Sequence, residues 1–174
     1  ALLAGAALMP LGGLVSGAVM LGHFGGMFLP SPVAGRLADR VSRSTCILMG
    51  GLVLGLGAAL FVRTDLVWLA GLGLFCVGAG WCLTYIPGSA ILADATSFEE
   101  RGTLFGTNDA VVSLFGATMT ILAGFLYAGW GVLGLAFLGL GCGALPFAAG
   151  FALRHHRVAR APSRADAVAP SDEA

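Results

Sequence analysis

Five apolar stretches, each long enough to cross a lipid bilayer, constrain what this sequence can fold into. A membrane-spanning α-helix needs about 20 mostly apolar residues, because each residue advances the helix by about 1.5 Å. Ahead of the five stretches, Ala1–Gly13 is apolar but short, and we expect Pro10 to end it. The sequence therefore predicts an all-α, polytopic transmembrane helix bundle with five full spans and one partial span over residues 1–13. The five full spans are Val15–Ala34, Ser44–Val62, Leu66–Ala93, Thr103–Ala128 and Gly131–Leu153.

The composition excludes the common classes of soluble protein. Of 174 residues, 57% are hydrophobic and 10% are charged, whereas a soluble domain carries about 25% charged residues. So few polar side chains cannot cover a water-soluble protein of this size. The formal net charge is zero, which offers no basic surface to nucleic acid. We expect a membrane protein that is not an enzyme, surrounded by lipid, with no nucleic-acid partner, no cofactor and no bound metal.

The 28 glycines indicate close helix packing rather than flexible linkers. In lipid, small residues spaced four apart let helix backbones approach one another. Such pairs occur throughout the chain, which predicts a tightly packed bundle. The pairs are Gly13/Gly17, Gly22/Gly26, Gly51/Gly55, Gly102/Gly106 and Gly139/Gly143.

The arginines predict the orientation in the membrane. If the spans alternate in direction, Arg63 lies alone on one side and the other eight arginines lie on the opposite side. Cytoplasmic loops carry the excess of basic residues, so the arginine-rich side is expected to face the cytoplasm across the plasma membrane. Residues 154–174 are rich in Ala, Arg, Pro, Ser and Asp, which predicts a disordered cytoplasmic tail.

Two charged connections lie on the arginine-rich side, over Gly35–Arg43 (GRLADRVSR) and Asp94–Gly102 (DATSFEERG). We expect the first to be a short turn between two helices. Opposite charges at one membrane face could latch helix pairs in one conformational state and release them in another. The alternative is that these charges are solvated and only set the topology. The charges that could form the latch are Asp39, Arg40, Asp94 and Arg101.

The two connections carry a resemblance to the major facilitator superfamily (MFS). The first resembles the G-x-L-a-D-r-x-G-r-r loop between the second and third helices of each half of these transporters. Ser42 stands where the family usually has glycine. The second resembles the loop between the fourth and fifth helices of a half, through Ala93-Asp94 and Glu100-Arg101-Gly102. The resemblance covers Val15–Leu153, and the matching positions of the first loop are Gly35, Asp39, Arg40 and Arg43.

The resemblance implies an MFS-type fold for the whole helical region. It implies the C-terminal half, with helices eight to twelve and the end of helix seven, and a missing N-terminal half as partner. The expected activity is secondary transport of a small-molecule substrate by alternating access, with protons as the coupling ion. The alternative is a truncated or structural membrane protein without transport activity of its own. The resemblance makes six residues candidates for cytoplasmic gating: Gly35, Asp39, Arg40, Arg43, Asp94 and Arg101.

Two ionisable side chains, His23 and Asp109, lie clearly inside the expected spans. Such residues are costly in a membrane and usually serve a function. Histidine changes charge near neutral pH, so His23 could carry a coupling proton. The alternative is a neutral ring bonded to a backbone carbonyl. Asp109, next to Asn108, could accept a proton or hold a cation, or could be an anion stabilised near a helix N-terminus.

Trp81 and Tyr85 stand four residues apart in the long span Leu66–Ala93, so they share one helix face. They could line a substrate site, or they could only pack against a neighbouring helix. Pro87 in the same span is expected to bend it. The candidate substrate and proton-coupling residues are His23, Trp81, Tyr85, Asn108 and Asp109.

Overall fold

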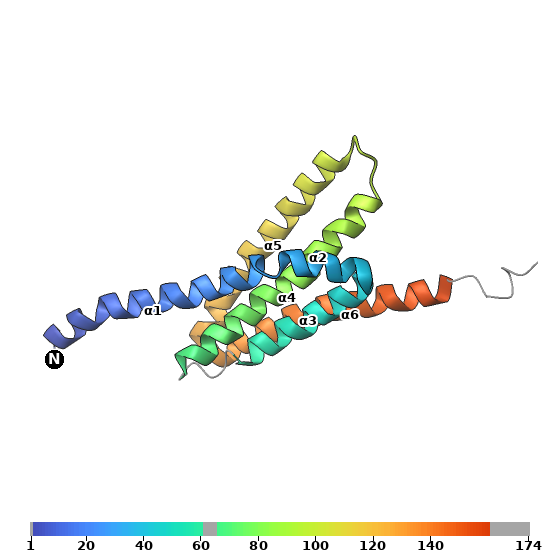
Figure 1. Cartoon of the computed structure of the whole chain (residues 1–174). Helices are drawn as coiled ribbons and strands as arrows, with labels where there is room; N and C mark the ends of the chain where they lie inside the picture. The colour runs from blue at the N-terminus through green and yellow to red at the C-terminus, as the bar shows by residue number, and fades with distance from the viewer. Residues whose placement is uncertain (1, 61–65, 161–174) are drawn as a thin grey trace, which may run out of the picture.

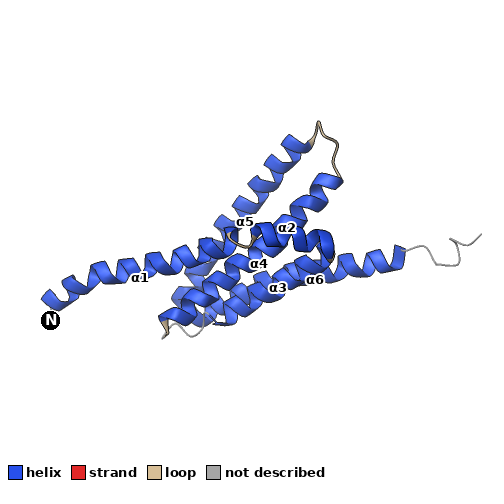
Figure 2. Ribbon diagram, in the orientation of Figure 1, coloured by secondary structure: helices blue, strands red, loops and turns tan. Residues whose placement is uncertain are grey.

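The computed structural model describes residues 2–60 and 66–160, and nearly all of them are helical (Figures 1 and 2). Five stretches within these residues are long and apolar enough to cross a membrane. The chain is therefore an all-α, polytopic helix bundle, as the apolar stretches predict. The helices are α1 (Leu2–Phe28), α2 (Ser31–Arg40), α3 (Arg43–Leu60), α4 (Val67–Asp94), α5 (Arg101–Trp130) and α6 (Val132–Arg160).

Helix α3 lies at the centre of the bundle, packed between α4 and α6. Helix α1 packs on α4, and the short α2 contacts both α3 and α4. Helix α5 packs on α6 and has no buried residue. The α2–α3 turn, the α4–α5 loop and the C-terminal end of α6 lie toward the same end of the bundle, on the right in Figure 1. We call this the charged end.

The first expected span is divided in two, and its start differs from the prediction. Helix α1 passes through position 10 without ending, so the expectation for Pro10 is wrong. The helix ends instead at Phe28, and α2 starts at Ser31. Two prolines explain the break, because neither Pro30 nor Pro32 has an amide hydrogen to continue the helical bonds. A single proline removes only one bond, which a long helix tolerates.

The first charged connection is mostly helix, not a loop over Gly35–Arg43. Helix α2 continues to Arg40, and only two residues separate it from α3. The amide of Val41 still donates to the carbonyl of Leu37 at 2.9 Å, which closes the last turn of α2. The Ser42 hydroxyl accepts a hydrogen bond from the Thr45 amide at 3.2 Å. Ser42 therefore caps α3, a role that suits serine at a helix start.

The later spans agree with the prediction to within a few residues at most of their ends. Only Gly131 separates α5 from α6, and its φ of 60° favours glycine. Helix α6 runs on to Arg160, so the start of the expected disordered tail is helical. Arginine and alanine are good helix formers, and a helix need not end where its apolar side chains end. Residues 161–174 of that tail lie outside the described residues.

Glycines bring the helix backbones into direct contact at four crossings. One is α5–α6, where a Cβ on Gly134 would lie 2.6 Å from the Leu126 carbonyl oxygen. At α1–α4, a Cβ on Gly26 would collide with the Phe75 carbonyl. At α3–α4 a Cβ on Gly80 would lie 2.6 Å from the Leu54 nitrogen, and at α3–α6 a Cβ on Gly51 would lie 2.5 Å from the Phe147 nitrogen. Both distances are shorter than atoms can approach. Not every predicted pair takes part: a Cβ would meet nothing within 4 Å at Gly13, Gly17, Gly102 and Gly106.

Candidate functional site

Four of the five candidate substrate residues lie together between α4 and α5. The Tyr85 hydroxyl donates to Asp109 Oδ1 at 2.7 Å. The rings of Trp81 and Tyr85 are stacked, with centroids 4.5 Å apart and an interplanar angle of 11°. The Asn108 amide lies 3.5 Å from the same Asp109 oxygen, at the limit of a hydrogen bond. We call these four residues the aromatic–carboxylate group.

The group lies deep within the expected membrane region. Tyr85 precedes the end of α4 at Asp94 by nine residues, or about 14 Å along the helix. Asp109 follows the start of α5 at Arg101 by eight residues, or about 12 Å. The two side chains therefore stand at matched depth, approaching the middle of a hydrocarbon core about 30 Å thick. A helix dipole acts mainly on its first turn, so the start of α5 stabilises Asp109 little.

No basic side chain among the described residues compensates the charge of Asp109. The one salt bridge found in that part of the chain joins Arg43 to Asp94. Both hydrogen bonds to Asp109 go to Oδ1, and no described residue donates to Oδ2. A carboxylate without a counter-ion favours a cation beside it, because the cation cancels its charge.

His23 lies apart from the aromatic–carboxylate group, at the crossing of α1 and α4. Its Nδ1 is 3.0 Å from the carbonyl oxygen of Leu74. A carbonyl only accepts, so Nδ1 carries the hydrogen in this contact. Leu74 precedes Trp81 by seven residues, about 10 Å along α4. This geometry is that of the structural alternative, in which the ring is bonded to a neighbouring backbone.

The break between α1 and α2 brings Ser31 and Cys82 together near the site. The sequence did not predict this pair. The Ser31 hydroxyl donates to the Met27 carbonyl at 3.4 Å and lies 3.7 Å from Cys82 Sγ. Cys82 is fully buried and follows Trp81 directly, so the break packs on α4 at the level of the aromatic pair. The Pro30-Ser31-Pro32 run was the available signal, since two close prolines interrupt a helix more effectively than one.

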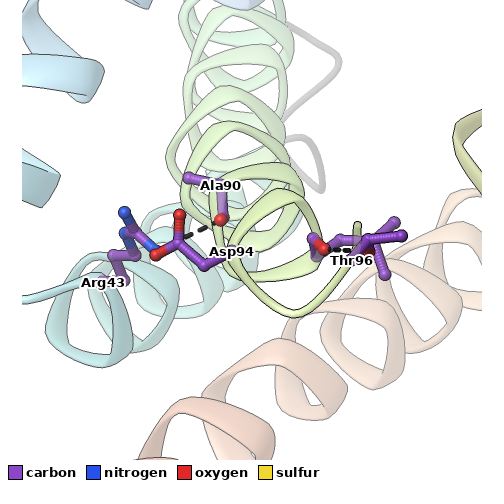
Figure 3. A network of polar contacts seen from close by, with 5 residues as sticks. Arg43, Ala90, Asp94 and Thr96 are labelled. Carbon is purple, nitrogen blue, oxygen red and sulfur yellow. Dashed lines mark hydrogen bonds and ion pairs between the residues drawn. The ribbon is translucent and has the colours of Figure 1, made fainter. Parts of the chain in front are cut away.

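At the charged end, Arg43 and Asp94 form the pair that joins α3 to α4. The Arg43 guanidinium donates to the Asp94 carboxylate and, at 3.1 Å, to the Ala90 carbonyl (Figure 3). Asp39 lines the same surface pocket of about 420 Å³ with both of them. Of the charges expected at this end, Asp94 therefore pairs with Arg43 from α3.

The remaining gating candidates make weaker contacts. Arg40 is exposed at the end of α2. The Arg101 guanidinium lies 6.0 Å from the centre of the exposed Phe98 ring, a cation–π contact within the α4–α5 region. Gly35 lies on α2, and a Cβ there would meet nothing within 4 Å.

Comparison with known proteins identifies one family. A family model described as the Major Facilitator Superfamily matches residues 3–172, nearly the whole chain. No solved structure matches the chain.

Three curated relatives are named as transporters of this kind. The uncharacterized MFS-type transporter YdeG of Bacillus subtilis (strain 168) is 34% identical over 119 residues, covering 67% of this chain and 28% of that protein. YddS, an uncharacterized MFS-type transporter of the same strain, is 35% identical over 109 residues, 61% of this chain and 25% of its own. The MFS-type transporter phm3 of Pyrenochaetopsis sp is 27% identical over 152 residues, 82% of this chain and 31% of its own. The chain thus matches less than a third of each relative's length.

Proposed function

This chain belongs to the major facilitator superfamily, and from that premise we propose that it is part of a secondary transporter of a small molecule. The proposed mechanism is alternating access across the plasma membrane, in which two halves rock around a central site. The complete transporter would place this chain as its C-terminal half, opposite an N-terminal half that supplies the other wall. The charged end would face the cytoplasm, because most of the arginines lie there.

One observation carries the proposal of a transport site: the Tyr85–Asp109 hydrogen bond between α4 and α5. An ionisable residue at this depth is costly, and one kept there without a basic partner usually serves transport. The break between α1 and α2 supports the same location. Interrupted helices at mid-membrane depth commonly mark transporter binding sites, and Ser31 sets this break against α4 beside Trp81.

Asp109 is also the residue that best supports proton coupling. As a carboxylate it only accepts hydrogen bonds, and Tyr85 is its donor. Once protonated, Asp109 is neutral and can itself donate a hydrogen bond, so its hydrogen bond with Tyr85 is no longer one to a charged group. A proton gradient can drive transport if the two conformations hold that proton with different affinity.

The test uses the complete protein in everted membrane vesicles energised by respiration. Vesicles with and without the protein are incubated with a panel of labelled amines, sugars, amino acids and organic acids. We expect accumulation of one class that a protonophore abolishes and that Asp109→Asn reduces by at least tenfold, with Glu99→Gln at the α4–α5 loop unaffected. Equal accumulation in the two vesicle preparations for every class would contradict the proposal.

A further inference from the structure

The chemistry of the aromatic–carboxylate group points to the kind of solute it holds. The rings of Trp81 and Tyr85 stack face to face on α4, which leaves the outer face of each ring as a π surface. Ring faces carry partial negative charge and attract cations, most strongly when water is excluded. Both residues are only partly buried, so part of this surface is accessible.

The carboxylate beside this surface is oriented and has a free oxygen. Tyr85 and Asn108 hold Asp109 through Oδ1, which leaves Oδ2 without a donor among the described residues. Tyr85 belongs to both parts of the group, since its ring stacks on Trp81 while its hydroxyl fixes Asp109. A π surface and a carboxylate oxygen are thus held side by side by one residue.

Divalent metal cations fit this arrangement poorly. Ca²⁺ and Mg²⁺ need six or more oxygen ligands, some of which water can supply to Mg²⁺. The described residues contain no group of three or more His, Cys, Asp or Glu side chains that could hold a metal ion. An anion is disfavoured by the charge of Asp109, and a neutral solute would leave that charge uncompensated unless a proton also bound.

We propose that the aromatic–carboxylate group binds an organic cation, such as an amine or quaternary ammonium carried on an apolar body. The cationic centre lies at Asp109 Oδ2 and the apolar body lies against the Trp81–Tyr85 surface. A proton on Oδ2 removes the charge that holds the cation, so proton and cation compete for one atom and exchange across the membrane. This inference rests on the proposed transport function and adds the substrate class to it.

Binding to the complete protein in lipid nanodiscs tests the proposal directly. Two shape-matched probe pairs that differ in charge are used: benzyltrimethylammonium with its neutral isostere neopentylbenzene, and tetraphenylphosphonium with its anionic counterpart tetraphenylborate. Titration calorimetry is run at several pH values. We expect at least one cation to bind at least tenfold more tightly than its partner, and its affinity to fall as the pH is lowered and Oδ2 is protonated.

Variants test the contributions of the carboxylate and of the aromatic rings separately. Asp109→Asn should weaken cation binding at least tenfold while Asp109→Glu retains part of it, which excludes misfolding as the cause. Trp81→Leu should weaken binding by about 2- to 30-fold, the range of a cation–π contact. Glu99→Gln, which removes a carboxylate outside the group, should bind as the parent does.

The outcomes distinguish this inference from the transport function. Three results would overturn the inference. They are failure of both cations to bind, equal binding of each cation and its shape-matched partner, and unchanged cation binding in Asp109→Asn. If the vesicle assay shows transport in that case, the proposed function stands with another substrate class. Cation binding without any vesicle transport would instead retain the site and contradict the transport function.

Discussion

The Tyr85 hydroxyl donates to Asp109 across two helices that otherwise pack on different neighbours. Helix α4 packs on α1 and α3, whereas α5 packs on α6. One hydrogen bond to an intramembrane carboxylate therefore connects the central part of the bundle to its least buried helix. Since hydrogen bonds to charged groups contribute about 1.5–3 kcal/mol, this bond is strong enough to bias the relative position of α4 and α5.

Tyr85→Phe tests this connection by removing one oxygen while keeping the stacked ring. We expect the initial transport rate of the complete protein in everted vesicles to fall about tenfold, as expected from the lower part of that energy range. Tyr127→Phe is the matched control, because Tyr127 lies exposed near the end of α5. Equal rates in the two variants would show that the hydroxyl of Tyr85 has no role in transport.

His23 should behave as a structural residue. Replacing it with alanine removes the hydrogen bond to the Leu74 carbonyl, so the free energy of unfolding should fall by about 1–3 kcal/mol. The pH dependence of transport should keep its shape, because the ring lies about 10 Å along α4 from Trp81. Thermal unfolding and a pH series of vesicle transport measure the two effects. A flattened pH profile in His23→Ala would instead assign His23 to proton coupling.

Gly51→Ala should destabilise the bundle, because the added methyl would overlap the backbone of α6 at Phe147. Overpacking of this kind costs about 1–3 kcal/mol. The matched control is Gly106→Ala, where a Cβ meets nothing within 4 Å and alanine favours the helix. Thermal unfolding in detergent should show a lower midpoint for the first variant only. The prediction fails if the two midpoints shift alike.

The Arg43–Asp94 pair should contribute only modestly to stability. The Asp94 side chain is 66% exposed and that of Arg43 is 24% exposed, so water and salt screen their attraction. A double-mutant cycle with Arg43→Gln and Asp94→Asn should give a coupling of about 0.2–1 kcal/mol that decreases with added salt. A salt-independent coupling well above this range would show that the pair is shielded from water in the complete protein.

If the pair acts as a latch, its effect should appear in conformation more than in stability. Arg43→Gln and Asp94→Asn should each shift the populations of the inward- and outward-facing states, and Arg40→Gln should not, because Arg40 is exposed at the end of α2. Spin-label distances across the charged end of the complete protein measure these populations. Unchanged distances in both variants would show that Arg43 and Asp94 do not act as a latch and only help to set the membrane topology.

The sequence predicts the long apolar helices well because their signal is local. Twenty apolar residues between charged turns form a spanning helix in almost any fold. The stacking of Trp81 on Tyr85 also follows from their spacing of four on one helix. The ends are less accurate, since α2 and α6 continue into polar sequence wherever backbone hydrogen bonds can still form.

The contacts between helices could not be predicted in the same way. The bond between Tyr85 and Asp109 depends on how α4 and α5 are placed, which no spacing within either helix specifies. The pairing of Arg43 with Asp94, 51 residues apart, is a further example, because the sequence offers several arginines on the same side of the membrane as partners for Asp94. The two close prolines could have predicted the break at Pro30. The apolar run that continues past Pro30 indicated one unbroken span instead.

The glycine crossings also have a mechanical consequence. Where backbone touches backbone, as at Gly80 on Leu54 and Gly51 on Phe147, no layer of side chains can change rotamer to absorb a displacement. Helices α3, α4 and α6 should therefore behave as one stiff body. Helix α5 makes such a contact only near its C-terminal end, where Gly134 of α6 lies against the Leu126 backbone. The rest of α5 should therefore be freer to tilt, and a tilt would change the hydrogen bond between Tyr85 and Asp109. Arrival of a solute or a proton at one oxygen atom of Asp109 would then act on the N-terminal part of α5, while the contact at Gly134 holds its other end against α6.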